Sequence, residues 1–380
     1  CTFQAEKKFK KFTIKGEIVA KDSSLLVLRY VPEATVFWDT TVIQHNKFTF
    51  SGQILEPTKA EVTLPDESQI LNVYLEPGVM EITIDKSNLV DFEMTGSRSQ
   101  KELTRLIKME EPVHKLIVSL KERNSVIADS IKNSKSEVQK QMFESIAEEI
   151  GIQLSKTRLI LDSIQLKFIL DNPKSYVSVE YLQMIEANEV ISLDSLKSIF
   201  YRMNSTLQNS KWGRYIKEDI RRKENTKIGA QAPDFKAIDL RQQTITISQF
   251  RGKNVVLLNF WASWCIPCRQ EIPNLKTFYK KYHSRGLEIV AVSTDWIKDK
   301  WITAVEHYST ELWINISVAQ NYAAGPSKLT NDDIYKNYFV QRIPFQILID
   351  TCGKIIGKWG GGLPDTGESL HAVLESLFEK

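Results

Sequence analysis

The sequence predicts a multidomain protein: an N-terminal antiparallel β-sandwich-like domain, a helical middle segment and a C-terminal α/β domain. The prediction rests on the spacing of hydrophobic residues along the chain. They recur every second residue at first and about every 3.6 residues from near residue 97, and from residue 228 apolar strands alternate with helices. A length of 380 residues also fits two or three domains. The expected segments are a tether at 1–10, a β-rich domain at 11–96, a helical segment at 97–223 and the α/β domain at 228–380.

The overall composition excludes several classes of protein. With 42% apolar and 26% charged residues, the chain can form real cores and is not disordered throughout. The net charge is only +3, so no nucleic-acid partner is expected. No stretch has the roughly 18 apolar residues that a membrane-spanning helix requires. Any chemistry must therefore be local.

The first segment consists of short runs in which apolar and polar residues alternate. Turn residues separate the runs at intervals of roughly 8–12 residues, as in an antiparallel sandwich or barrel. Prolines fall between the runs, where a missing N–H does not interrupt a strand ladder. The runs are 12–15, 25–31, 48–50, 60–64, 70–75 and 80–84.

Beyond Gly96 the apolar residues recur about every 3.6 positions, which predicts a few long helices packed on their neighbours. Ser192 is placed to cap one of these helices. The polar stretch 221–227 is expected to be a linker. The clearest apolar stripe of the segment is Val138, Met142, Ile146, Ile150 and Leu154.

The last segment alternates strands and helices, which is typical of a layered α/β sheet. Strongly apolar strands are expected at 255–260 and 345–349, and a hairpin through Gly353 follows the second of them. The remaining expected elements are a helix at 265–283, strands at 287–292 and 355–359, and a closing helix at 368–378.

The most specific motif is a C-x-x-C, formed by Cys265 and Cys268, where an apolar strand runs into a helix. A thiolate at a helix N-terminus faces unpaired backbone N–H groups and the positive end of the helix dipole, which lower its pKa. We expect Cys265 to be the exposed cysteine and Cys268, one turn inward, to be shielded. Pro267 suits the first turn because its missing N–H would have no acceptor there.

Two other uses of this motif are disfavoured. A zinc site needs four ligands, and the chain has neither a second C-x-x-C nor a clustered pair of histidines, so no metal is expected. A peroxidase of the P-x-x-x-T-x-x-C type would need a proline in place of Leu258 and a threonine in place of Ala262. Cys352 lies in the expected hairpin, far along the strand from the motif, and is expected to be inert.

The segment 228–380 resembles the thioredoxin fold, and in particular the TlpA/ResA-like envelope thiol-disulfide oxidoreductases. The order of a β-rich segment, a helical segment and this module also resembles a recurrent arrangement of bacterial lipoproteins. The motifs that carry the resemblance are Pro233-Asp234-Phe235, Phe250-Arg251-Gly252-Lys253, Trp261-Ala262-Ser263-Trp264-Cys265, Pro267-Cys268-Arg269 and Glu271-Ile272-Pro273.

The resemblance implies thiol-disulfide exchange without any cofactor beyond the redox-active cysteine pair. Cys265 as a thiolate attacks the disulfide of a partner protein, and Cys268 then resolves the mixed disulfide. The resemblance favours the reductase direction, with protein disulfides as substrates and a membrane thiol reductant as the electron donor. The alternative is a non-catalytic envelope scaffold in which the C-x-x-C forms a structural disulfide.

The resemblance also assigns the residues around the cysteines. Trp264, Ile266 and Pro267 would contact the substrate. Ile343 and Pro344 match the family's cis-proline segment, whose backbone would pair with an extended substrate.

Glu271 matches the carboxylate that ResA-like proteins have near their cysteines, which matters because Asn259 stands where thioredoxin has a buried aspartate. An acidic residue early in a helix also interacts favourably with the helix dipole, so both roles for Glu271 stay open.

Cys1 has two interpretations. It is the acylated residue of a processed bacterial lipoprotein, which would tether the protein to the periplasmic face of a membrane, or it is the accidental first residue of a trimmed chain. The first interpretation predicts a location in the bacterial cell envelope. The sequence does not specify an oligomeric state.

Overall fold

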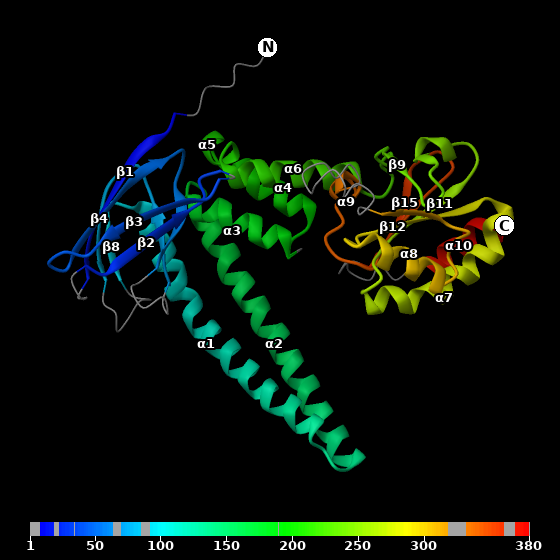
Figure 1. The fold of residues 1–380 in the computed structure, drawn as a ribbon, viewed down its shortest axis with the longest axis horizontal. Coiled ribbons are helices and arrows are strands. Elements are labelled where there is room, and N and C mark those ends of the chain that lie inside the picture. Colours follow the sequence, from blue (N-terminus) through cyan, green and yellow to red (C-terminus); the bar gives the residue numbers. More distant parts are fainter. Residues whose placement is uncertain are drawn as a thin grey trace. The chain divides into compact units, whose positions relative to one another are not determined.

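The computed structural model describes residues 8–18, 23–33, 35–63, 70–84, 92–188, 190–317, 332–360 and 369–379. Contacts within the chain divide it into two compact units, Cys1–Lys217 and Glu218–Lys380. The first unit holds the N-terminal sheets and most of the helical segment, and the second holds the α/β sheet (Figure 1).

The N-terminal strands form two four-stranded sheets, with strand orders β4-β1-β7-β8 and β3-β2-β5-β6. Alternate residues of both sheets, such as Phe12 and Ile14 of β1 and Leu26 and Leu28 of β2, enter one shared hydrophobic core. The strands are β1 (Lys10–Ile18), β2 (Leu25–Tyr30), β3 (Phe37–Val42), β4 (Lys47–Ile54), β5 (Thr58–Thr63), β6 (Ile70–Leu75), β7 (Gly78–Ile84) and β8 (Glu93–Thr95).

The expectation that this domain is antiparallel throughout is wrong for one pair of strands. β1 and β7 pair in parallel, with Ile14 opposite Met80. The physical reason is the route of the chain: β6, which precedes β7, belongs to the other sheet, so β7 enters its sheet by a crossover and not by a hairpin. The pairs β1–β4, β7–β8, β2–β3, β2–β5 and β5–β6 are antiparallel.

Two long helices, α1 (Arg98–Lys132) and α2 (Glu137–Asp171), form an antiparallel hairpin (Figure 1). Serine side chains at the N-caps of both helices, Ser97 and Ser136, accept a backbone N–H of the first turn. The helix α1 continues through Pro112, where the sequence pattern was interrupted. The shorter helices that follow are α3 (Tyr176–Ala187), α4 (Leu193–Arg202), α5 (Ser205–Gln208) and α6 (Lys211–Asn225).

Two expectations for the helical segment need correction. In the predicted stripe on α2, Ile150 is buried, but Val138 is 78% exposed and Met142 is 52% exposed. The polar stretch 221–227 is not an open linker, because α6 continues to Asn225. Ion pairs one turn apart, such as Arg221 with Glu218, favour the helical conformation there.

The second unit is built on a five-stranded sheet with the order β13-β12-β11-β14-β15. The strands β11, β12 and β13 are parallel to one another, and β14 and β15 are antiparallel to their neighbours. A small hairpin of β9 (Lys236–Ile238) and β10 (Thr244–Thr246) precedes the sheet. The elements of the layered part are β11 (Val255–Trp261), α7 (Ile266–Tyr282), β12 (Leu287–Ser293), α8 (Lys298–His307), β13 (Ile314–Ser317), α9 (Asp332–Asn337), β14 (Phe345–Ile349), β15 (Ile355–Gly360) and α10 (Leu370–Phe378).

The central strand β11 is buried along its whole length. Val255, Leu257 and Trp261 share one core with residues of α7, α8 and α10, while the alternating residues of β11 share a second core with α9. Because both faces of β11 are covered, its C-terminal end is held in a fixed position, and the C-x-x-C motif follows directly. None of the helices in the described ranges is long and apolar enough to cross a membrane.

Candidate active site

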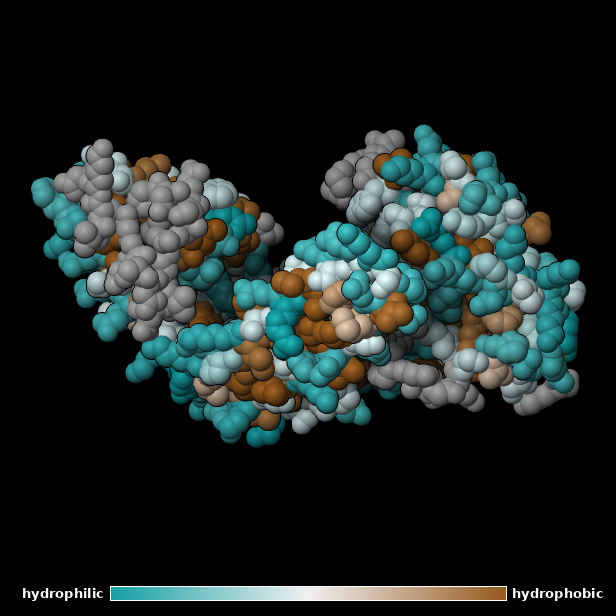
Figure 2. Space-filling view, turned by 90° about the horizontal axis from the view of Figure 1, so that it is seen from below, coloured by the Kyte–Doolittle hydropathy of each residue, from teal (hydrophilic) through white to brown (hydrophobic). Residues whose placement is uncertain are grey.

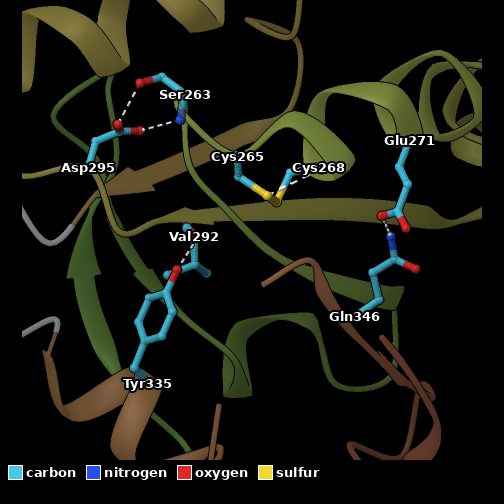
Figure 3. Close-up of a disulfide and its surroundings, with 8 residues drawn as sticks. All are labelled: Ser263, Cys265, Cys268, Glu271, Val292, Asp295, Tyr335 and Gln346. Carbon is cyan, nitrogen blue, oxygen red and sulfur yellow. Dashed lines mark hydrogen bonds between the residues drawn. A yellow bond between two sulfur atoms is a disulfide. The ribbon is translucent and has the colours of Figure 1, made fainter. Parts of the chain in front are cut away.

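Cys265 and Cys268 form a disulfide at the start of α7, with an S–S distance of 1.97 Å and a Cα–Cα distance of 5.3 Å (Figure 3). Cys265 is the N-cap residue of the helix, and Pro267 lies in its first turn. The backbone N–H of Cys268 donates to Sγ of Cys265 at 3.2 Å. The sulfur of Cys265 therefore lies where an unpaired N–H group of the helix can stabilise a negative charge.

The expectation that Cys265 is exposed is wrong for this oxidised form. Cys265 is 4% exposed and Cys268 is 3% exposed, and both belong to the core shared with α7. The disulfide holds the sulfur of Cys265 against Cys268 within this core. In contrast, Trp264 is 62% exposed and Ile266 is 58% exposed.

A buried carboxylate, Asp295, connects the loop before the cysteines to the end of β12. It accepts two hydrogen bonds from Ser263, one from the backbone N–H at 2.9 Å and one from the hydroxyl at 2.6 Å (Figure 3). It accepts a third from the hydroxyl of Ser293 at 2.7 Å. The next two residues, Trp296 and Ile297, are 55% and 53% exposed. Two exposed apolar pairs thus lie on loops that Asp295 joins.

The sequence reasoning missed Asp295, Trp296 and Ile297. A signal was available, since residues that follow neighbouring parallel strands meet at the same edge of a sheet. β11 and β12 are such neighbours, and these three residues follow β12 as the C-x-x-C follows β11.

Glu271 lies one turn beyond Cys268 on α7, and its Oε2 accepts a hydrogen bond of 2.7 Å from Nε2 of Gln346 on β14 (Figure 3). Burial raises the pKa of Glu271 above its ordinary value of 4.5, and the hydrogen bond from Gln346 lowers it in part. In the sheet Gln346 is directly opposite Asn259 of β11, which is buried. The position held by an aspartate in thioredoxin thus carries an uncharged amide, and the titrating carboxyl group lies on α7.

Ile343 and Pro344 lie immediately before β14, and the peptide bond between them is cis. Ile343 packs against the cores on both sides of the sheet. Gly360, at the end of β15, has a φ of 81°, and a Cβ atom at this position would collide with the carbonyl oxygen of Pro344. The backbone around Pro344 is therefore closely backed by β15.

The remaining candidates lie away from the disulfide or outside the described residues. Cys352 is an exposed free thiol in the turn between β14 and β15. Cys1 lies outside the described residues. Within the described ranges, no three His, Cys, Asp or Glu side chains are grouped as metal ligands would be.

Comparison with known proteins gives matches to both units. Residues 228–374 match the AhpC/TSA family, and residues 12–103 match a domain of unknown function, DUF4369. The ResA thiol-disulfide oxidoreductase of Bacillus thuringiensis subsp. konkukian is 33% identical over 156 residues, which are 41% of this chain and 82% of the relative. ResA of Bacillus subtilis is 33% identical over 134 residues, 35% of this chain and 68% of the relative.

Two solved structures are also similar to the C-terminal part. The thioredoxin domain of a thiol-disulfide oxidoreductase from Bacteroides vulgatus is 29% identical, with a TM-score of 0.33, and the match covers 40% of this chain and 98% of that one. A thiol:disulfide interchange protein from a Bacteroides species is 28% identical, with a TM-score of 0.34 and a coverage of 41% and 93%.

The match to ResA extends over most of each relative, and it covers a thioredoxin-like domain whose cysteine pair is joined as a disulfide. The scaffold alternative is accordingly not favoured. This chain belongs to the ResA-like thioredoxin-fold family of thiol-disulfide oxidoreductases, enzymes of thiol-disulfide exchange.

Proposed function

We propose that the protein reduces disulfides of bacterial envelope proteins through Cys265 and Cys268. The observation that carries the proposal is the C-x-x-C disulfide at the N-terminus of α7, where the N–H of Cys268 donates to the sulfur of Cys265. Once the disulfide has been reduced, the same N–H and the helix dipole favour the thiolate of Cys265.

The reaction has two steps. The thiolate of Cys265 attacks one sulfur of the partner's disulfide, and the other sulfur of the partner leaves as a thiolate. Cys268 then loses its proton and attacks Sγ of Cys265, which releases the second sulfur of the partner. Two electrons have passed to the partner, and the Cys265–Cys268 pair is oxidised. A membrane thiol reductant restores the dithiol, and no cofactor takes part.

Glu271 is the proposed acceptor of the proton from Cys268. Its side chain is half-buried, and its raised pKa brings it closer to the range in which it can exchange a proton near neutral pH. Gln346 holds one carboxylate oxygen, so the orientation of the group is fixed.

The substrate surface is proposed to consist of apolar side chains around the buried disulfide. Trp264 and Ile266 flank Cys265, and Trp296 and Ile297 extend the surface from the loop that Asp295 joins to Ser263. These four side chains are more than half exposed, whereas the sulfur atoms are covered. A partner therefore binds to the apolar surface first and reaches Cys265 from there.

Pro267 and the segment of Ile343 and Pro344 complete the proposed substrate surface. The backbone that precedes β14 lies next to the end of β11, since Phe345 pairs with Phe260. An extended substrate segment would pair with this backbone as an added strand, which would place its disulfide near Cys265.

The N-terminal half is proposed to support this reaction at the membrane. Cys1 carries a lipid anchor and residues 1–10 act as a tether, so that the protein faces the periplasm. The β-rich domain (11–96) is a sandwich-like module, and together with the helical segment (97–223) it serves the catalytic domain (228–380) as a spacer, a docking surface or a dimerisation module. Its two sheets share one core, in line with this description.

Reduction of insulin by dithiothreitol, with the full chain as catalyst, tests the function. The wild type should accelerate precipitation of the insulin B chain, and Cys265→Ser should abolish the acceleration. Cys268→Ala should accumulate mixed disulfides with partners in envelope extracts, because the resolving thiol is missing. The matched control, Cys352→Ser, removes the exposed thiol and should leave both results unchanged. An inactive wild type, or an active Cys265→Ser variant, would exclude the mechanism.

A further inference from the structure

The helix α2 has a second apolar side that no described element covers. At about 100° per residue, six exposed apolar side chains fall within about 100° of the helix circumference, and they form what we call the outer stripe. Gln165 and Phe168, which contact Glu110 and Arg105 of α1, point to the opposite side. The outer stripe consists of Val138, Met142, Ile152, Leu159, Ile160 and Leu170, each at least 48% exposed.

The outer stripe is long. From Val138 to Leu170 the helix rises about 48 Å, since each residue adds about 1.5 Å. Figure 2, in which the hairpin of α1 and α2 points towards the viewer, shows hydrophobic residues reaching the surface between hydrophilic ones. A helix with apolar residues on two sides normally has a partner on each side. On one side of α2 the partner is α1.

We propose that the outer stripe is the interface with a second copy of this chain, in which two α2 helices pack antiparallel around a two-fold axis. The charges on α2 favour this direction. Residues 137–153 carry four acidic and one basic side chain, and residues 154–171 carry three basic and two acidic side chains. An antiparallel pair places the acidic half of each helix along the basic half of the other, whereas a parallel pair would place like charges together.

Two charged residues within the outer stripe fix the register. Glu149 and Lys156 are both exposed and lie seven residues, or two turns, apart on the same side of α2. A two-fold axis that passes midway between them places Glu149 of each copy beside Lys156 of the other. The symmetric dimer thus contains this ion pair twice, and Ile152 lies close to the axis.

The size of the surface indicates a reversible dimer. A strip about 48 Å long and about 10 Å wide covers roughly 500 Å² on each copy, or about 1,000 Å² in total, which is the lower limit for a specific interface. We therefore expect a dissociation constant in the micromolar range. The two-fold arrangement uses the same surface on both copies, so assembly stops at the dimer.

Sedimentation velocity of the full chain, at concentrations from about 1 to 200 μM, tests the proposal by charge reversal. Glu149→Lys alone and Lys156→Glu alone each bring like charges together twice, so each variant should be monomeric at concentrations where the wild type dimerises. The double variant restores both pairs and should dimerise again. An equimolar mixture of the two single variants should form a heterodimer. The control Glu122→Lys changes an exposed acidic residue of α1 and should leave the dimer intact.

Leu159→Asp tests the apolar part of the same interface. It should abolish the dimer while the far-ultraviolet circular dichroism stays that of the wild type, since Leu159 is 62% exposed in the single chain. A wild type that remains monomeric up to 200 μM overturns the proposal, as does a dimer that survives both single charge reversals. Insulin reduction by the monomeric variants is measured separately, and its result bears on the catalytic proposal alone.

Discussion

Asp295 offers the sharpest single test of how the active-site loop is held. Asp295 is 2% exposed, and its carboxylate accepts three hydrogen bonds, two of them from Ser263. Hydrogen bonds to a charged group contribute about 1.5–3 kcal/mol each, but bonds that share one acceptor group are not additive. We therefore assign about 3 kcal/mol to the whole arrangement. Asp295→Ala should lower by that amount the free energy that holds the loop at Ser263 in the observed conformation.

The expected signal is faster hydrogen exchange of the Ser263 amide, whose proton Asp295 binds. A loss of about 3 kcal/mol corresponds to roughly 100-fold faster exchange, because about 1.4 kcal/mol changes an equilibrium tenfold. Asp295→Asn keeps an oxygen acceptor but loses the charge, so its acceleration should be about tenfold. Exchange is followed by NMR, or by mass spectrometry of the peptide that contains Ser263.

The matched control is Asp299→Ala, which removes an exposed carboxylate four residues further along. It should not change the exchange of the Ser263 amide. If Asp295→Ala leaves that exchange within threefold of the wild type, Asp295 does not hold the loop, and the proposed link between the two parts of the apolar surface fails.

Three further predictions concern the same domain. The double substitution Trp296→Ser and Ile297→Ser removes apolar contact with a protein substrate, so it should lower kcat/KM for insulin about tenfold. It should leave kcat/KM for a small aromatic disulfide unchanged, and an equal fall for both substrates would contradict a docking role. Because burial raises the pKa of Glu271, its contribution to the free energy of unfolding is complete below pH 4.5 and is lost as the pH rises through the raised pKa, so Glu271→Gln should remove this pH dependence. Gln346→Leu removes a hydrogen bond that lowers the pKa of Glu271 and should move the loss of stability to higher pH. Identical profiles of unfolding free energy for the wild type and both variants, from urea titrations at pH 4 to 8, would refute this. Gly360→Ala should displace the backbone at Pro344 and slow insulin reduction at least tenfold, while the Cys265–Cys268 disulfide still forms. A variant with full activity would show that the close approach of Gly360 to the carbonyl oxygen of Pro344 is not needed for the reaction.

Six elements of the second unit could be predicted to within two residues, because their signals are local: β11, α7, β12, β14, β15 and α10. The strands β9, β10 and β13 and the helices α8 and α9 were not predicted. The strand β11 is buried on both faces, so every position in it except Asn259 is hydrophobic and the run can be recognised in the sequence. The C-x-x-C and Pro267 mark the beginning of α7 by their own chemistry. Each of these features depends only on neighbouring residues in the chain.

The features that were not predicted depend on which distant elements meet. The parallel pairing of β1 and β7 follows from the crossover between two sheets, and no residue of either strand encodes it alone. On α2, periodicity identifies apolar positions but does not show which of them α1 covers, so the predicted stripe contains the exposed Val138 and Met142 as well as the buried Ile150.

The reactivity of Cys265 is predicted by its local motif, whereas its burial depends on distant parts of the chain. The motif predicts a reactive sulfur, yet the surrounding structure covers this sulfur and exposes Trp264, Ile266, Trp296 and Ile297 instead. In the proposed mechanism, a partner contacts these exposed side chains before it reaches the buried sulfur. Selectivity among disulfides would consequently reside in this apolar surface, while the helix N-terminus determines how reactive the thiolate is once it has been reached.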